Sequence, residues 1–277
     1  MAATTSTTLD DLFANIIAQA RFTAEQQSLM LGLVTPYNIG STPGKTIQIP
    51  KYPSIAAAAL TEGTDMSSTT VSTSSVTVTI AEVGAQVLLT DLARDGHGNP
   101  AIELGTVLGS AIAKKMDQDL LALFDGFSTS LGSAGTEITV ADIFKAVAIL
   151  QNNNAPGSLA AVIHPYTAYQ LKANLTNTFA NPHGGDAQNE AMRSSFVGSL
   201  GGVDIFQSSN LTVDGNDDVK GAVFSREALA IALKRDFQIE TQRDASLRAT
   251  ELNATAVYGV GELDDTYGVE LFFDAAV

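Results

Sequence analysis

The acidic stretch at 214–218 is the part of the chain whose residue types and spacing most resemble a metal site. Asp214, Asn216 and Asp218 alternate as in the first half of a calcium-binding loop, where carboxylate and amide oxygens bind the ion. The match then fails, because Val219 replaces the required glycine and Ser225 stands where the bidentate glutamate belongs. We therefore interpret this stretch as a solvated turn.

The three histidines, His97, His164 and His183, lack the spacing of a metal or catalytic motif, since none has a partner three to five residues away. The sequence contains no nucleophile elbow, no P-loop and no dinucleotide fingerprint. The absence of cysteine excludes disulfides and thiolate chemistry. His164 precedes Pro165 at a strand-to-helix corner, where we expect a structural role. We expect no catalytic residue, no metal and no cofactor, and therefore no enzymatic activity.

Two Arg-Asp pairs, Arg235-Asp236 and Arg243-Asp244, lie eight residues apart in strand-like sequence. An even spacing places both arginines on one face of a strand if the strand is unbroken. Two interpretations stay open: ion pairs between subunits, or an exposed face that contributes little to stability.

The charge of the chain is strongly negative and is spread along its length. The net charge is -15, and the tightest basic pairs are Lys114-Lys115 and Lys234-Arg235. This distribution disfavours a groove that neutralises a row of phosphates, whereas a diffuse acidic surface lets DNA lie nearby without sticking. The first basic residue is Arg21, and no run of about 18 apolar residues exists. We expect a soluble, intracellular protein with neither a signal peptide nor a membrane span.

Two helical segments are predicted in the first half of the chain. Residues 8–21 form an amphipathic pattern, and the Pro and Gly residues of 36–44 then end helical character, so this segment is a candidate arm that needs a surface to pack on. Residues 99–127 carry apolar residues at a strict spacing of four. Because 3.6 residues make one turn, this stripe winds around the helix, which is typical of a long spine that contacts several elements. The stripe consists of Leu104, Leu108, Ile112, Met116, Leu120 and Phe124.

The segment between these helices predicts a long β-hairpin. The strand-like sequences "KTIQIP" and "SVTVTIAEVGAQVLLT" flank a tract rich in Ser and Thr. Such a ribbon could project on the order of 60 Å, beyond a domain whose radius of gyration is about 17 Å. A two-stranded ribbon is marginal alone, so we expect it to be stabilised by a neighbouring subunit; a flexible surface loop is the alternative. The candidate contacts between subunits are Glu62, Asp65, Val76, Val78, Ile80, Arg235, Asp236, Arg243 and Asp244.

The remaining sequence alternates helices and strands and becomes strand-rich from residue 203. The order is arm, ribbon, long helix, an α/β insert and then strands, which indicates an α+β fold in one interwoven unit.

This order of elements resembles the major capsid proteins of tailed bacteriophages with the Hong Kong 97-type fold, over nearly the whole chain. The matching segments are "AAVIHPYTAYQLKANL" and "GSLGGVDIFQSSNL" for an axial domain, "FSREALAIALKRDFQIETQRD" for peripheral strands, and "YGVGELDDTYGVELFF" as a closing segment. The resemblance implies a division into an N-terminal arm (1–44), an extended loop (45–98), a peripheral domain with the spine helix (99–135 and 230–262) and an axial domain (136–229 and 263–277).

The resemblance also implies a function and a set of partners. It implies an icosahedral shell of pentamers and hexamers that encloses double-stranded DNA without reading its sequence. The expected partners are copies of the chain itself, a portal, and scaffolding or decoration proteins. The expected location is the virion capsid, after assembly in the host cytoplasm.

The extended loop departs from one pattern among the proteins that it resembles. Some relatives cross-link their subunits through a lysine on this loop, but residues 52–93 contain no lysine, and only Lys45 and Lys51 remain at its base. We therefore expect non-covalent assembly. Two other functions stay open on the sequence: a cellular nanocompartment shell with an enzyme cargo, and a β-rich binding protein or hydrolase that works as a monomer or small oligomer.

Overall fold

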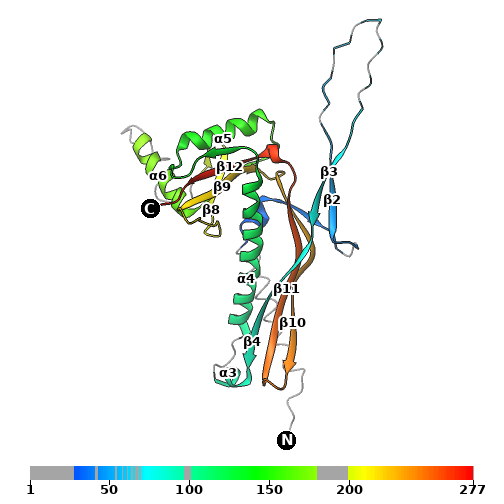
Figure 1. Cartoon of the computed structure of the whole chain (residues 1–277), viewed down its shortest axis with the longest axis vertical. Helices are drawn as coiled ribbons and strands as arrows, with labels where there is room; N and C mark the ends of the chain where they lie inside the picture. Colours follow the sequence, from blue (N-terminus) through cyan, green and yellow to red (C-terminus); the bar gives the residue numbers. More distant parts are fainter. Residues whose placement is uncertain are drawn as a thin grey trace.

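The computed structural model describes residues 28–40, 43–53, 70–96, 101–179 and 199–276, together with residues 55–57, 59, 60, 62, 63, 65 and 68. The predicted arm helix at 8–21 lies outside these residues, as do His97 and His183. Two sheets, each with its own helices, form the body, and a two-stranded ribbon projects from it (Figure 1).

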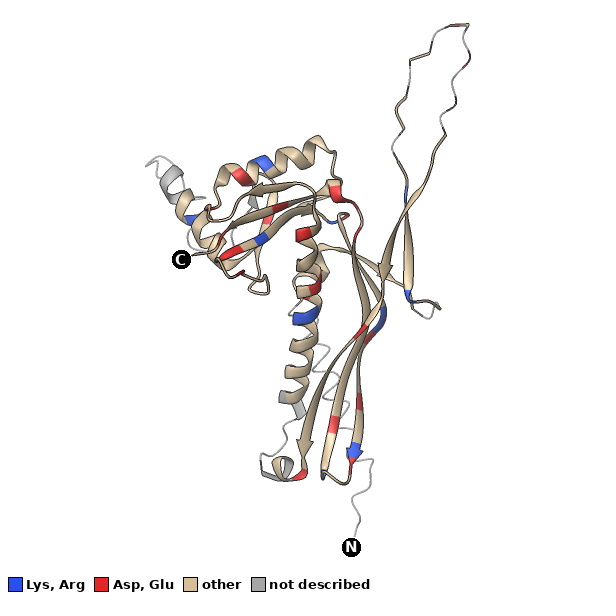
Figure 2. Ribbon diagram, viewed as in Figure 1, with Lys and Arg blue, Asp and Glu red and all other residues tan. Residues whose placement is uncertain are grey.

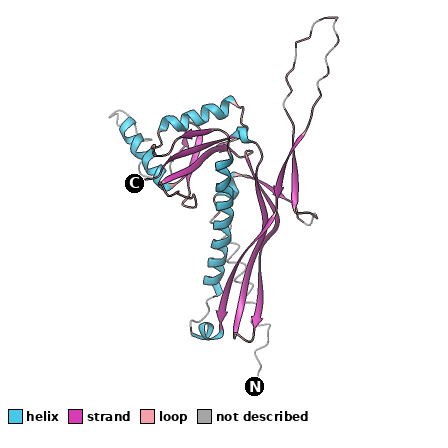
Figure 3. Cartoon of the chain, in the orientation of Figure 1, coloured by secondary structure: helices cyan, strands magenta, loops and turns pink. Residues whose placement is uncertain are grey.

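The four-stranded sheet lies along the long helix (Figures 1 and 3). Its strands follow the order β1-β10-β11-β4, in which β1 is parallel to β10 and the other pairs are antiparallel. Short helices stand at its two ends. The elements are α2 (Met30–Leu33), β1 (Thr35–Asn38), β4 (Ala81–Thr90), α3 (Asp91–Gly96), α4 (Ala101–Leu121), η1 (Ala122–Gly126), β10 (Leu229–Asp244) and β11 (Ala249–Glu262).

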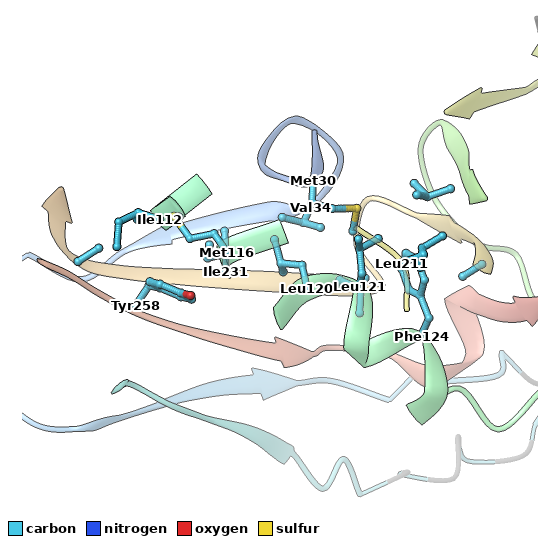
Figure 4. Packing of buried hydrophobic residues seen from close by; sticks show 14 of the residues in the cluster. Met30, Val34, Ile112, Met116, Leu120, Leu121, Phe124, Leu211, Ile231 and Tyr258 are labelled. Carbon is cyan, nitrogen blue, oxygen red and sulfur yellow. The ribbon is translucent and has the colours of Figure 1, made fainter. Parts of the chain in front are cut away.

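The winding apolar stripe predicted for the long helix is confirmed. Leu108, Ile112 and Leu120 are buried, and they lie in one cluster with side chains of the sheet. Figure 4 shows the stripe beside Ile231 of β10 and Tyr258 of β11. Because the stripe turns as it advances, the first part of the helix packs on the four-stranded sheet and its last turn reaches the second sheet.

The six-stranded sheet is covered on both faces. Its order is β5-β12-β9-β6-β8-β7. Helices α5 and α6 cover one face, and the end of the long helix, with Phe124 against Phe224 of β9, covers the other. Burial on both sides explains why these strands are almost continuously apolar. The elements are β5 (Ser130–Gly132), α5 (Val140–Asn152), β6 (Leu159–Ile163), α6 (Pro165–Phe179), β7 (Ser199–Leu200), β8 (Val203–Gln207), β9 (Asp218–Ser225), η2 (Asp265–Tyr267) and β12 (Gly268–Asp274).

The ribbon is shorter than the sequence predicts. Strand β2 (Thr46–Lys51) pairs with β3 (Ser74–Thr79), but β4, which the sequence places in the returning strand of the hairpin, pairs with β11. The alternating apolar residues of β4 explain this correction, because Val83 and Val87 are half-buried and pack against the core of the body.

Candidate assembly surfaces

The loop beyond the ribbon exposes apolar side chains. Tyr52 is 71% exposed and Leu60 is 67% exposed, and Ile55 is also exposed. The acidic residues Glu62 and Asp65 are exposed near the tip, where Figure 2 shows few charges of either sign. Large apolar side chains in this number on a projecting loop indicate a surface that another chain covers.

The base of the ribbon packs on the chain's own β11. Val78 is 1% exposed and Ile80 is also buried, while Val76 is half-buried. Val78 lies against Gly259 and Gly261; a Cβ atom added to Gly261 would lie 2.7 Å from Val78 Cγ2. Val78 and Ile80, which the sequence places among the contacts between subunits, are therefore buried in their own subunit, because two glycines let the ribbon approach the sheet closely.

The two arginines of β10 lie on opposite faces of the sheet. The register shifts between Arg235 and Gln238, which marks a β-bulge, so the condition of an unbroken strand is not met. Arg235 is opposite Val257 and Arg243 is opposite Thr250, and these two partners are an odd number of positions apart along β11. Since side chains alternate along a strand, the even spacing no longer places both arginines on one face.

Each arginine pairs with an acid of its own chain. Arg235 lies 3.8 Å from Glu82, and Arg243 donates two hydrogen bonds to Asp91, at 2.9 and 2.7 Å. The hydrogen bonds from Arg243 to Asp91 raise the pKa of the guanidinium. The structure thus offers a partner within the subunit for both cations, and the pairs are exposed.

The acidic neighbours of the arginines cap the backbone locally. Asp236 accepts a hydrogen bond from the Phe237 backbone N–H, at 2.8 Å. Asp244 accepts hydrogen bonds from Ser246 and from the Leu247 backbone N–H, and these bonds lower the pKa of its carboxyl. Asp244 therefore shapes the turn between β10 and β11.

Asp117 and Asp119 of the long helix connect distant segments of the chain. The sequence did not indicate this role. Asp117 is 1% exposed and accepts hydrogen bonds from Ser28 Oγ at 2.8 Å and from the backbone N–H groups of Leu29 and Met30 at 3.2 Å. Asp119 accepts a hydrogen bond from the Tyr258 hydroxyl, at 2.8 Å. Burial, the hydrogen bond to Asp119 and its charge raise the pKa of Tyr258.

A cavity of about 250 Å³ lies between the end of the long helix and the six-stranded sheet. Its carboxylates already have partners: Asp125 pairs with Lys220, Asp214 accepts from the backbone of its own turn, and Asp218 accepts from the Gly135 backbone N–H. The described residues contain no group of three or more acids or histidines that could hold a metal ion.

His164 lies at the corner between β6 and α6. It is buried, and its Nδ1 accepts a hydrogen bond from the Tyr166 backbone N–H, at 3.3 Å. Burial lowers the pKa of the imidazole. The residue caps the helix, in line with the structural role predicted from the sequence. Of the helices described, none is long and apolar enough to cross a membrane.

The projecting ribbon, the long helix and the two packed sheets define a structural subunit of the Hong Kong 97-like type. The sequence profile of the phage capsid protein family matches residues 53–270. The chain belongs to this family, and it is a major capsid protein of the tailed-phage type.

Solved structures share the fold at low sequence identity. The capsid structure of the cyanophage P-SCSP1u is 19% identical over 90% of this chain and 89% of that chain, with a TM-score of 0.69. The acidic stable capsid of the Helicobacter pylori bacteriophage KHP30 is 12% identical over 89% and 91%, with a TM-score of 0.71. The SrpI encapsulin from Synechococcus elongatus PCC 7942 is 11% identical over 90% and 88%, with a TM-score of 0.65. None of the curated protein sequences matches the chain. The predicted α+β capsid fold is thus confirmed.

Proposed function

We propose that copies of this chain assemble through pentamers and hexamers into an icosahedral shell around the double-stranded DNA of a tailed phage. The observation that carries this proposal is the loop that projects beyond the ribbon, because its apolar side chains Tyr52, Ile55 and Leu60 are exposed in a single subunit. A second copy removes this surface from water at a gain of roughly 25 cal/mol per Å².

The loop tip and the outer face of the four-stranded sheet are the proposed contacts between subunits. Glu62 and Asp65 are exposed on the loop, and Val76 is partly exposed on β3 of the ribbon. Arg235 and Asp236 are exposed on β10. Arg243 and Asp244 contribute by holding the end of the sheet in shape, so their role between subunits is indirect.

The enclosed DNA is held without sequence recognition. The net charge of -15 and the scattered basic residues disfavour a row of cations for phosphates, so DNA is confined by the shell rather than bound. Further proposed partners are a portal, and scaffolding or decoration proteins. Assembly takes place in the host cytoplasm. The same scaffold serves encapsulins, but the family match favours a phage shell over a nanocompartment.

Negative-stain electron microscopy of the purified protein tests the proposal. We expect closed shells, or hexamers that convert to shells as the concentration rises. A discrete small particle at every concentration on size-exclusion chromatography would contradict shell formation.

Deletion of residues 62–75 tests the role of the ribbon. We expect the shortened chain to keep the far-ultraviolet circular dichroism of the body, because both sheets lie outside the deletion, and to form no shells. Shells at normal yield would show that the deleted part of the loop is dispensable.

A further inference from the structure

The far end of the ribbon ladder is joined to the body by one ion pair. Lys51 is the last residue of β2 and lies opposite Ser74, the first residue of β3. Its Nζ lies 2.6 Å from Asp264 Oδ2, and the Asp264 side chain is only 12% exposed. Beyond this point the described residues of the loop form no ladder, so the ion pair stands where the paired ribbon ends and the loop begins.

Asp264 lies in the joint between the two sheets. The chain passes between them at 225–229, before β10, and at 262–268, after β11. The backbone N–H groups of Leu263 and Asp264 donate to the Ala228 carbonyl, at 2.7 and 3.3 Å, so the two connections are bonded to each other. Asp265 accepts a hydrogen bond from the Ser128 backbone N–H, at 2.6 Å, which ties the joint to the end of the long helix.

The joint concentrates negative charge that Lys51 compensates. Burial opposes ionisation of Asp264, but hydrogen bonds from Lys51 and Thr266 outweigh it and lower the pKa of the carboxyl. Burial raises the pKa of Glu262, and the charges of Asp265 and Asp264 raise it further, while Lys51 acts in the opposite direction. Removal of the Lys51 charge therefore leaves three neighbouring carboxyl groups without this cation.

We propose that the Lys51–Asp264 ion pair is a latch that fixes the direction of the ribbon and transmits movement of the inter-sheet joint to the loop tip. The loop from Lys51 to Gly63 spans about 12 residues, or on the order of 40 Å when extended. Because the loop starts at Lys51, the direction of β2 at this residue sets the region that the tip can reach. We expect a modest contribution to global stability, because the Lys51 side chain is 44% exposed and water screens its charge. The ion pair acts instead on the position of the ribbon and the loop relative to the body.

The absence of cysteine allows a direct measurement in the full-length chain. Ser68→Cys on the loop and Ala148→Cys on α5 accept nitroxide labels, and their distance distribution is measured by pulsed electron paramagnetic resonance. Labelled chains are diluted with unlabelled chains so that only distances within one subunit contribute. We expect Lys51→Met and Asp264→Asn each to widen the distribution at least about twofold, because packing alone then holds the base.

Three further variants separate a latch from a general loss of structure. Lys51→Arg keeps the charge and should keep the distribution of the natural chain. The swap of Lys51→Asp with Asp264→Lys should restore it. Lys115→Met is the matched control, because it removes the ion pair with Asp119 on the long helix and should leave the ribbon unchanged. The thermal midpoints should stay within about 2 °C of each other.

Unchanged widths in Lys51→Met and Asp264→Asn would overturn the proposal, and so would equal widening in Lys115→Met. Only the role of this ion pair in shell assembly rests on the proposed function. The label distances are measured whether or not shells form, so failure of the latch and failure of shell assembly are distinguishable.

Discussion

Single buried side chains connect segments that lie far apart in the sequence. Asp117 joins the long helix to Ser28, Leu29 and Met30, the first described residues of the chain. A buried carboxylate persists only where hydrogen bonds satisfy it, and here two backbone N–H groups and a hydroxyl do so. The segment that follows the predicted arm is thereby fixed on the long helix.

Substitution of Asp117 should release this segment. We expect Asp117→Ala to lower the free energy of unfolding of the unassembled chain by about 2 to 4 kcal/mol, because it leaves buried donors without an acceptor. Urea denaturation followed by circular dichroism measures the change. Ser28→Ala removes one of the three donors and should cost less. Lys115→Ala, at an exposed position on the same helix, should cost almost nothing, and an equal loss there would contradict the explanation.

His164 gives the folded chain a dependence on pH. Burial lowers the pKa of its imidazole, so below about pH 6.5 the unfolded chain binds a proton more readily than the folded chain does. The neutral imidazole therefore makes a contribution to the free energy of unfolding that depends on pH. This contribution is fully present above about pH 6.5 and is lost as the pH falls toward the lowered pKa of the folded state.

The variant His164→Asn should remove that contribution, because asparagine keeps an acceptor for the Tyr166 N–H but does not titrate. The free energy of unfolding of both chains is measured from about pH 7.5 to about pH 5.5. The natural chain should lose more stability than the variant over this range. Parallel profiles would show that His164 does not titrate differently on folding.

Elements were predictable from the sequence where one periodicity extended over many residues. The stripe of the long helix was readable, because local spacing determines it. The pairing of β4 was not readable, since it depends on which distant surface offers its alternate residues the better burial. Asp117 was missed because an acid in "KKMDQDL" has the pattern of an exposed helix face.

The register in which β10 pairs with β11 could not be predicted from the sequence either. The bulge that separates Arg235 from Arg243 inserts one residue without a compositional signal, and it reverses the face on which every later side chain lies. Contacts that need an exact face of a long strand therefore require the structure.

Close packing of the ribbon on β11 depends on glycine. A Cβ atom at Gly259 would collide with the Thr79 carbonyl of the ribbon backbone, which cannot move without shifting the ribbon. We expect Gly259→Ala to destabilise the unassembled chain by about 1 to 3 kcal/mol. Thermal unfolding measures this loss. Gly32→Ala is the control, because nothing lies within 4 Å of its added Cβ, and it should be neutral.

At the scale of the whole molecule, the chain divides its apolar surface between itself and its neighbours. The two sheets share the long helix, and the two apolar clusters meet across the six-stranded sheet. Large apolar side chains stay exposed on the loop beyond Lys51, and others stay exposed on the body, among them Leu92, Tyr166 and Tyr169. We expect contacts between subunits at both places.

The residues available for covalent links between subunits predict how shells respond to denaturation. Residues 52–93 carry no lysine that could form an isopeptide bond, and the chain has no cysteine for disulfides, so contacts between subunits are expected to be non-covalent. Shells boiled in detergent should therefore run as monomers of 28.8 kDa on a denaturing gel. A ladder of multimers would require a covalent link, and Lys45 before β2 and Lys51 at the end of β2 would be the first positions to test, through Lys45→Arg and Lys51→Arg. The second of these variants keeps the charge that faces Asp264, so it removes the amine without removing the ion pair.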